Sequence, residues 1–457
     1  MKKNRHYLLL ALLTCFSLYA NAQQLREGKN VLFGIGEPLV LTGITADKTS
    51  ASFSAAEYIL DAMNFGAIRA WMHQTEILRS PSEANPDKVR QYTDALNMYA
   101  GLGMEITGLS HRWFIVGKDG TLVQSDGRMY RRDTTEGSLY IKSLQAIEEG
   151  WRTMVALFPQ VEQWEVGNEW NTSDFLNVYP EDDTPLTDEE RMEIATDMMY
   201  YAYRGIKSGN PKASVVSFSP AIAMSSFAGK DGHERMVPFT NAGYGIALAL
   251  SRIYANIASG QYPAGLTPDK DPDHYFDMVA WHPYLLTGMN PMIVSDAYPA
   301  HGRFFREEHV DALWQNFNDM AYNVMVMNGD ADKKVLLTEM GFNDWHNPDK
   351  EQAHLAEYER LFAMVSETMP YVKTVHLFRL LTAPAEYQFG LFWHGMKGYN
   401  DWLSKSNFKD MVAPYAEVYP DFTPRDKAYA IQKMTGGTKP LELPKEIRSR
   451  IEVTIKQ

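Results

Sequence analysis

Short apolar runs alternate along the chain with longer segments in which apolar residues return at helical spacing. The runs with the length of buried strands are Val31–Gly34, Ala67–Trp71, Met104–Gly108, Gln163–Gly167, Ser214–Phe218, Met278–His282, Val335–Thr338 and Thr374–Phe378. The segments with helical period are Ser54–Asn64, Asp87–Leu102, Ser138–Leu157, Asp188–Ser208, Ala242–Ala258, Val310–Asn328, His354–Glu367 and Arg425–Thr435. Because each helical segment follows a strand, the pattern predicts a parallel sheet with crossover helices.

Eight alternations of strand and helix are the number that closes a (β/α)8 TIM barrel, and a doubly wound open sheet is the main alternative. The long connections after strands are Trp113–Gly137, Ala221–Thr240, Leu285–Glu308 and Ala383–Tyr419. In a barrel these loops lie on the C-terminal rim, where they form the binding cleft. We assign residues 23–437 to the barrel and residues 438–457, with a candidate strand at Arg450–Ile455, to a C-terminal extension packed on it.

The N-terminus has the pattern of an export signal. A basic start precedes the apolar stretch Tyr7–Leu18, which is too short to span a bilayer comfortably. The small-x-small sequence at residues 20–22 is a cleavage site, so residues 1–22 are predicted to be a signal peptide. We therefore expect export to the periplasm or the cell exterior, with no membrane insertion. Lipid anchoring at Cys15 is the alternative, but Thr14 matches a lipoprotein box poorly and the better cleavage site follows.

Composition limits the chemistry of the mature chain. Cys15 is the only cysteine, so the mature protein has no thiol nucleophile, no thiolate metal site and no disulfide. The formal net charge of −13 disfavours nucleic acid and anionic membranes as partners. Aromatic residues make up 12% of the chain, which supplies flat apolar platforms for sugar rings as well as core side chains.

Two of the predicted strands end abruptly in a glutamate. Glu169 closes the apolar run that begins at Gln163, and Glu339 closes the run that begins at Lys334. A strand that delivers a carboxylate at its C-terminal end places it at the mouth of a barrel. Two such carboxylates facing each other across a substrate are the minimum equipment for cleaving a glycosidic bond with retention.

The same two segments resemble a known group of enzymes. The sequences Trp-Glu-Val-Gly-Asn-Glu, ending at Glu169, and Leu-Thr-Glu-Met-Gly-Phe, around Glu339, resemble the clan A glycoside hydrolases. Those enzymes are (β/α)8 barrels that retain anomeric configuration. The resemblance implies that Glu169 is the acid/base, that Asn168 bonds the sugar 2-hydroxyl and that Glu339 is the nucleophile.

Two further positions match that pattern. Arg69, at the end of the second strand, corresponds to an arginine that hydrogen-bonds the nucleophile, although a purely structural ion pair is the alternative. His282-Pro283-Tyr284, at the end of the sixth strand, corresponds to a His-x-Tyr motif whose tyrosine positions the nucleophile. Glu165 lies within the fourth strand, where a buried ion pair or a surface role is expected rather than catalysis.

The eighth strand departs from the pattern, because many clan members end it with a tryptophan that forms a floor for the sugar. This chain has Phe378 and Arg379 there, which we expect to stack on the substrate or contact its polar groups, and Trp393 supplies a platform from the following loop. The remaining predicted substrate-binding residues lie at the ends of the third and fourth strands, where packing is the alternative role. They are His111, Trp113 and Trp170.

These observations predict an exported retaining β-glycoside hydrolase that acts on a polysaccharide or oligosaccharide and needs no metal or organic cofactor. One alternative is a non-catalytic glycan-binding barrel. Another is a metal-dependent amidohydrolase using strand-end histidines such as His111, His282 and His376. Such a barrel normally begins with a His-x-His pair near the first strand, and residues 31–50 contain no histidine. The sugar, the linkage, endo or exo action and the oligomeric state stay open.

Overall fold

The computed structural model describes residues 31–181, 183–221, 224–228, 234–238, 244–284, 310–342, 348–381, 389–396 and 418–456. Several predictions fall outside these residues. They are the signal peptide with Cys15, the loop Leu285–Glu308, most of the loop Ala383–Tyr419 and the side chain of Trp393. Within the described part, no helix combines the length and the apolar character needed to cross a bilayer.

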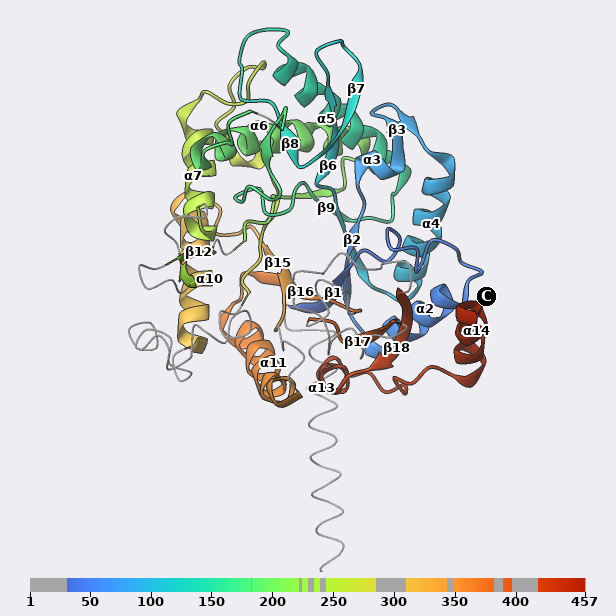
Figure 1. Cartoon of the computed structure of the whole chain (residues 1–457). Helices are drawn as coiled ribbons and strands as arrows, with labels where there is room; N and C mark the ends of the chain where they lie inside the picture. Colours follow the sequence, from blue (N-terminus) through green and yellow to red (C-terminus); the bar gives the residue numbers. More distant parts are fainter. Residues whose placement is uncertain are drawn as a thin grey trace, which may run out of the picture.

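Eight parallel strands form the centre of the molecule (Figure 1). In chain order they are β1 (Leu32–Glu37), β2 (Ala67–Trp71), β5 (Glu105–Leu109), β9 (Gln163–Glu165), β11 (Ser214–Val216), β14 (Val279–Trp281), β15 (Val335–Met340) and β16 (Val372–Phe378). Each strand pairs with its neighbours in this order, and β16 pairs with β1. Parallel bridges from Val216 to Met278 and from Ala221 to His282 join β11 to β14 and close the ring. The predicted (β/α)8 barrel is confirmed, and the alternative of a doubly wound open sheet is wrong.

A helix follows each barrel strand. These helices are α2 (Ala51–Met63), α4 (Pro86–Gly101), α5 (Leu139–Leu157), α6 (Asp188–Gly209), α7 (Ile246–Ser259), α10 (Val310–Met327), α11 (Pro348–Thr368) and α13 (Asp426–Thr435). Local sequence sets several of their first turns. Ser50 accepts a hydrogen bond from the Phe53 amide at the start of α2, and Thr187 forms a capping box with Glu190 at the start of α6.

Small elements fill the connections that leave the C-terminal ends of the barrel strands. They are α3 (Gln74–Ile77) and the pairs β3 (Leu78–Ser80) with β4 (Glu83–Ala84), β6 (Arg112–Val116) with β7 (Leu122–Asp126), β8 (Arg128–Met129) with β10 (Asn177–Val178), β12 (Met224–Ala228) with β13 (Glu234–Pro238), and β17 (Phe392–Met396) with β18 (Val418–Pro424). The predicted loop Trp113–Gly137 therefore contains most of a hairpin. Such additions build up the rim where a barrel carries its site.

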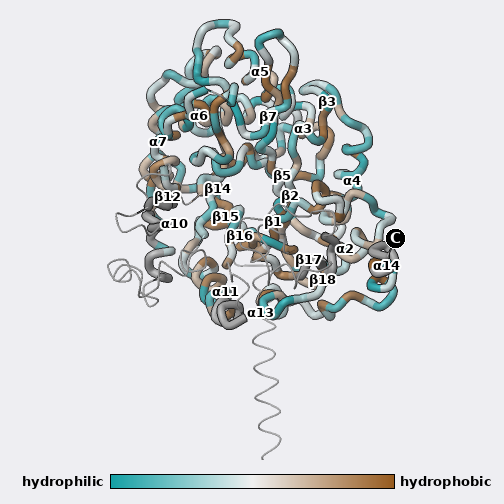
Figure 2. The backbone as a smooth tube through the Cα atoms, in the orientation of Figure 1, coloured by the Kyte–Doolittle hydropathy of each residue, from teal (hydrophilic) through white to brown (hydrophobic). Residues whose placement is uncertain are grey.

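The hydrophobic core runs through the barrel and out to its helices. Figure 2 shows hydrophobic stretches recurring along strands and helices, while hydrophilic stretches are common in the outer connections. Trp164 on β9 is fully buried and packs edge-on against Trp151 of α5. Gly108 on β5 makes room for this indole, because a Cβ atom at that position would lie 2.7 Å from the Trp164 ring. The largest side chain of the strand thus depends on the smallest residue of its neighbour.

The expected strand at Arg450–Ile455 is wrong, because this segment lies in helix α14 (Lys445–Lys456). Ile447 and Ile451 are four residues apart and both pack against the core, which is the spacing of one helix face. The C-terminal extension contacts α2, and Tyr58 donates a hydrogen bond to the carbonyl of Pro440. Burial of a helical stripe outweighed the short apolar alternation that suggested a strand.

Candidate active site

Glu169 follows β9 on a backbone that few residues other than glycine adopt. Its φ angle is 48°, in the left-handed region, which costs free energy for a residue with a Cβ atom. Two backbone bonds hold it there: its amide donates to the Ser219 carbonyl at 2.9 Å, and its carbonyl accepts from the Thr172 amide at 2.8 Å. The Glu169 side chain remains 18% exposed. Sharply turned backbone that presents a partly exposed carboxylate is typical of functional positions.

Glu339 lies near the end of β15 and is almost completely buried. Its two oxygens have different partners. Arg69 Nη1 lies 2.6 Å from Oε1, and the Tyr284 hydroxyl donates to Oε2 at 2.8 Å. Burial alone raises the pKa of Glu339, but His282, the Arg69 guanidinium and the Tyr284 hydrogen bond together lower it below the ordinary value. The group is therefore held as a carboxylate, the form that acts as a nucleophile.

Arg69 is fully buried on β2 and is shared among several acceptors. Its Nε and Nη2 lie 2.6 and 2.9 Å from the two oxygens of Glu165, and Nη2 also donates to Asn168 Oδ1 at 2.7 Å. Burial lowers the pKa of Arg69, but the charges of Glu165 and Glu339 outweigh it and the net shift is upward. Arg69 thus fits both of the roles considered for it, because it contacts Glu339 and also forms a buried ion pair.

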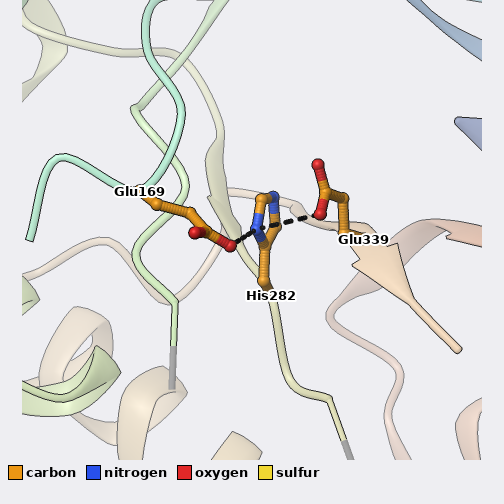
Figure 3. Close-up of side chains that lie close together, drawn as sticks. All are labelled: Glu169, His282 and Glu339. Carbon is orange, nitrogen blue, oxygen red and sulfur yellow. Dashed lines mark hydrogen bonds and ion pairs between the residues drawn. The ribbon is translucent and has the colours of Figure 1, made fainter. Parts of the chain in front are cut away.

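His282 lies between the two candidate catalytic carboxylates (Figure 3). Its Nδ1 is 2.7 Å from Glu169 Oε1 and 3.6 Å from Glu339 Oε2. One oxygen of each carboxylate and a ring nitrogen of His282 all lie within 4.8 Å of one another. Retaining glycosidases hold their carboxyl groups roughly 5–5.5 Å apart, whereas inverting enzymes leave about 6.5–9.5 Å for a water molecule. The closest oxygens of the two carboxylates here are thus nearer to the retaining range than to the inverting one.

The same three side chains could be considered as ligands of a metal ion. However, both oxygens of Glu339 already accept hydrogen bonds, one of them from the buried Arg69. A divalent cation bound there would lie close to the guanidinium charge, which would repel it. The arrangement therefore fits a pair of reacting carboxylates better than a metal centre.

Arg379, predicted to contact substrate from the end of the eighth strand, has a charged partner inside the barrel. This side chain is buried, and its Nη2 pairs with Glu37 Oε1 at 2.7 Å. Glu37 also accepts hydrogen bonds from the backbone amides of Leu380 and Leu381. The described contacts of Arg379 are therefore those of an ion pair within the barrel, and its contact with substrate stays a prediction. Phe378 lies edge-on to Tyr284 at 6.3 Å, beside the candidate nucleophile.

Trp113 and Trp170, predicted to bind substrate, are both packed into the core. Trp113 donates from its indole nitrogen to the Arg128 carbonyl and lies edge-on to Trp170. Trp170 is 1% exposed and stacks on Phe218. A Cβ atom on Gly167 would lie 2.1 Å from the Trp170 ring, so this glycine lets the indole fold beneath the turn. The described contacts of both indoles are packing contacts that support the turn carrying Glu169.

His111 lies behind the rim and has a neighbour that the sequence did not point to. Its ring is 4.2 Å from that of His73, and both side chains are buried. Burial and then the charges of Arg112 and Arg69 lower the pKa of His111 to about 3, so the imidazole is neutral at ordinary pH. A neutral imidazole suits hydrogen bonding to sugar hydroxyls, so substrate binding by His111 stays a prediction.

Three polar residues of this region were missed or given no role in the site by sequence reasoning. Glu37, Glu165 and Thr338 are all buried on barrel strands. The sequence did contain a signal for them, because each is a polar residue in a mostly apolar strand, and a buried polar group needs a hydrogen-bond partner. The sequence did not contain the identity of those partners, which come from other strands.

Comparison with known proteins agrees with this architecture. The complex of the virulence factor SghA of Agrobacterium tumefaciens with its substrate analog salicin superposes with a TM-score of 0.51 at 11% identity, covering 92% of this chain and 98% of that chain. A glycoside hydrolase family 5 variant from Bifidobacterium longum, in complex with Manβ1-4GlcNAc, superposes with a TM-score of 0.50 at 13% identity. The match covers 89% of this chain and 77% of that chain. A family 39 glycoside hydrolase from Bacteroides cellulosilyticus superposes with a TM-score of 0.49 at 15% identity, and the match covers 88% of this chain and 63% of that chain.

These likenesses show the fold. They agree with the (β/α)8 barrel that the resemblance to clan A hydrolases implies. No family model matches the sequence. No curated protein matches it either.

Proposed function

We propose that this protein is an exported retaining β-glycoside hydrolase. The observation that carries the proposal is the arrangement of Glu169 and Glu339 around His282, with Arg69 and Tyr284 donating to Glu339. Glu339, on β15, is buried and held ionised, while Glu169, which follows β9 across the barrel, is partly exposed. Two carboxyl groups in unlike surroundings at this separation are what double displacement requires.

The reaction would run in two balanced steps. First, a Glu339 oxygen attacks the anomeric carbon as the glycosidic bond breaks, and Glu169 gives its proton to the leaving oxygen. The sugar is then joined to Glu339 as an ester, and Glu169 is a carboxylate. In the second step Glu169 takes a proton from water, whose oxygen attacks the anomeric carbon and releases Glu339. Glu169 is again protonated, and the configuration at the anomeric carbon is retained.

Several features support a carbohydrate substrate. The solved structures named above contain the glycoside analog salicin and the disaccharide Manβ1-4GlcNAc. Small elements build up the C-terminal rim, which suits a substrate larger than one sugar ring. The N-terminal 22 residues support export, so the substrate would be met in the periplasm or outside the cell.

The first test is to incubate the purified protein with a panel of β-glycans and to chromatograph the products. We expect wild type to release sugars, and Glu339→Gln to be slower by about a thousandfold or more because it lacks the nucleophile. Glu105→Gln is the matched control. Glu105 starts β5 at the opposite end of the barrel and pairs with Lys373, so its loss should leave the rate within about threefold.

The role of Glu169 has a separate test. Glu169→Ala should lose most activity, and added azide should restore part of it by attacking the glycosyl-enzyme without needing a base. The azide product should carry the β configuration. An α product would contradict double displacement, and full activity of Glu169→Ala would remove Glu169 from the mechanism. Binding of glycans without release of sugar by wild type would instead favour a non-catalytic glycan-binding barrel.

A further inference from the structure

A chain of hydrogen bonds runs from Glu169 through the barrel to Glu165. Glu169 Oε1 is 2.7 Å from His282 Nδ1, and His282 Nε2 is 3.1 Å from Thr338 Oγ1. The Thr338 hydroxyl then donates to Glu165 Oε1 at 3.2 Å. Apart from Glu169, the members of this chain are buried; Glu165 and Thr338 lie on β9 and β15, and His282 directly follows β14. The ends of the chain are the candidate acid/base and a carboxylate to which the reaction gives no task.

Counting donors along this chain sets the direction of its hydrogen bonds. Glu165 takes two hydrogen bonds from Arg69 and another from Ser219, as an ionised carboxylate that only accepts. A threonine hydroxyl has one hydrogen to donate, and here it goes to Glu165. The Thr338 oxygen must then accept from His282, so His282 carries a proton on Nε2. The other ring nitrogen, Nδ1, faces Glu169.

The charged groups near His282 come from several barrel strands. Glu169 and Glu339 face Nδ1, and Glu165 lies beyond Thr338 on the Nε2 side. The cation of the cluster is Arg69, which Glu165 and Glu339 share. Tyr284 is an edge-on neighbour of the ring. His376 is buried on β16, and burial lowers its pKa to about 3, so it adds no charge.

We propose that Thr338 and Glu165 are positioning residues that hold the proton of His282 on Nε2, so that Nδ1 shares the acid/base proton with Glu169. This inference rests on the proposed function, because the shared proton has a catalytic role only in the proposed hydrolysis. In the first step the shared proton passes through Glu169 to the leaving oxygen, which leaves His282 with its remaining proton on Nε2. In the second step the proton taken from water returns to the Glu169–Nδ1 hydrogen bond.

Removing the Thr338 hydroxyl should weaken this hold. Without an acceptor at Nε2, a neutral His282 can carry its proton on Nδ1 and donate it to an ionised Glu169. The acid form of the pair is then less favoured. Thr338→Val keeps the shape of the side chain while removing the hydroxyl, and Thr338→Ser restores the hydroxyl.

The chain offers a matched control on the next strand. Thr374 is fully buried on β16, and its hydroxyl is buried without a hydrogen-bond partner. Thr374→Val is therefore the same substitution, in the same barrel and at the same burial, without the relay. We expect its thermal unfolding midpoint and its pH profile to match those of wild type.

The experiment has two readouts on the full mature protein. The first is the histidine ring nitrogen spectrum of 15N-labelled protein without substrate, with the His282 signals assigned by their loss in His282→Gln. The second is kcat/KM against pH on a cleaved glycan. We expect wild-type His282 to be protonated on Nε2. In Thr338→Val we expect a shift toward Nδ1 protonation and an alkaline limb lowered by about one pH unit, with both effects reversed in Thr338→Ser.

The two readouts separate failure of this inference from failure of the proposed function. A wild-type His282 protonated on Nδ1 alone would overturn the inference whatever the protein does to glycans. So would a Thr338→Val protein with an unchanged ring spectrum and an unchanged alkaline limb. Nε2 protonation that is lost in Thr338→Val would support the relay even if no glycan were cleaved, and in that case the proposed hydrolase activity alone would fail.

Discussion

Two of the buried carboxylate clusters among the described residues differ in character. Asp197 on α6 is fully buried and accepts hydrogen bonds from Arg132 at 2.8 Å, from the Tyr140 hydroxyl at 2.8 Å and from the Ala264 amide at 2.7 Å. One carboxylate faces one guanidinium, and every donor belongs to a segment that α6 packs against. This cluster ties α5, α6 and the segment before β14 together.

The cluster at the barrel mouth has more carboxylates than cations. Arg69 serves both Glu165 and Glu339, and Glu169 adds a third carboxylate a short distance away. Tyrosine and arginine donors are present in both clusters, yet the pKa shifts differ in sign. Burial raises the pKa of Asp197 beyond what Arg132, the Ala264 amide and Tyr140 can offset, whereas His282, Arg69 and Tyr284 overcome burial at Glu339. The same donor types therefore leave the pKa of one buried carboxyl group raised and hold the other as a carboxylate.

The largest expected effect comes from removing the carboxylate of each cluster. Asp197→Asn should destabilise the fold by about 3–5 kcal/mol, because it leaves Arg132 without its buried partner, and should leave kcat within about threefold. Glu339→Gln should do the reverse and lose activity with a smaller change in unfolding free energy. Urea unfolding and glycan hydrolysis of both variants test this. A large activity loss in Asp197→Asn, with the protein still folded, would contradict the separation of roles.

A smaller effect is expected from the two tyrosines. Tyr284→Phe removes a hydrogen bond that favours the ionised form of Glu339, so the pKa of Glu339 should rise. The acid limb of kcat/KM should then move to higher pH by about one unit. Tyr140→Phe makes the same change at Asp197 and should leave the profile where it was. Equal pH profiles for the two variants would show that Tyr284 does not act on the nucleophile.

The smallest effect is a difference in the pH dependence of stability. The lowered pKa of Glu339 contributes stability that is present above about pH 4.3 and is lost as pH falls further. The raised pKa of Asp197 acts in the opposite sense, because its protonation favours the fold as pH falls toward about 3.9. Comparing each variant with wild type by urea unfolding between about pH 3 and 7 should give differences of opposite slope. Slopes of the same sign would remove the contrast between the clusters.

The barrel and the positions of the two candidate catalytic carboxylates could be predicted because the evidence for them is local. Apolar runs and helical periods follow from the residues in each segment, and their order leads to eight parallel strands. Glu169 and Glu339 each end such a run, so the topology alone brings them to the same rim. The turn at Glu169 is also prepared locally, because Gly167 leaves space for Trp170.

Contacts between distant segments were decided only by the closed barrel. Nothing near Glu37 in the sequence indicates Arg379 as its partner, and this ion pair was not predicted. The burial of Trp113 against Trp170 likewise depends on how a rim hairpin packs on the turn after β9. The helix α14 forms because its apolar stripe meets α2.

The sequence by itself determined which residues stand at the strand ends, because periodicity and strand termination are properties of short segments. The tertiary structure decided which buried charge meets which. Arg69, Glu165 and Glu339 lie on three different strands, and they are brought within hydrogen-bonding distance by closure of the ring. Burial then makes each pairing costly to break, since an unpaired charge in the barrel would have neither water nor a partner.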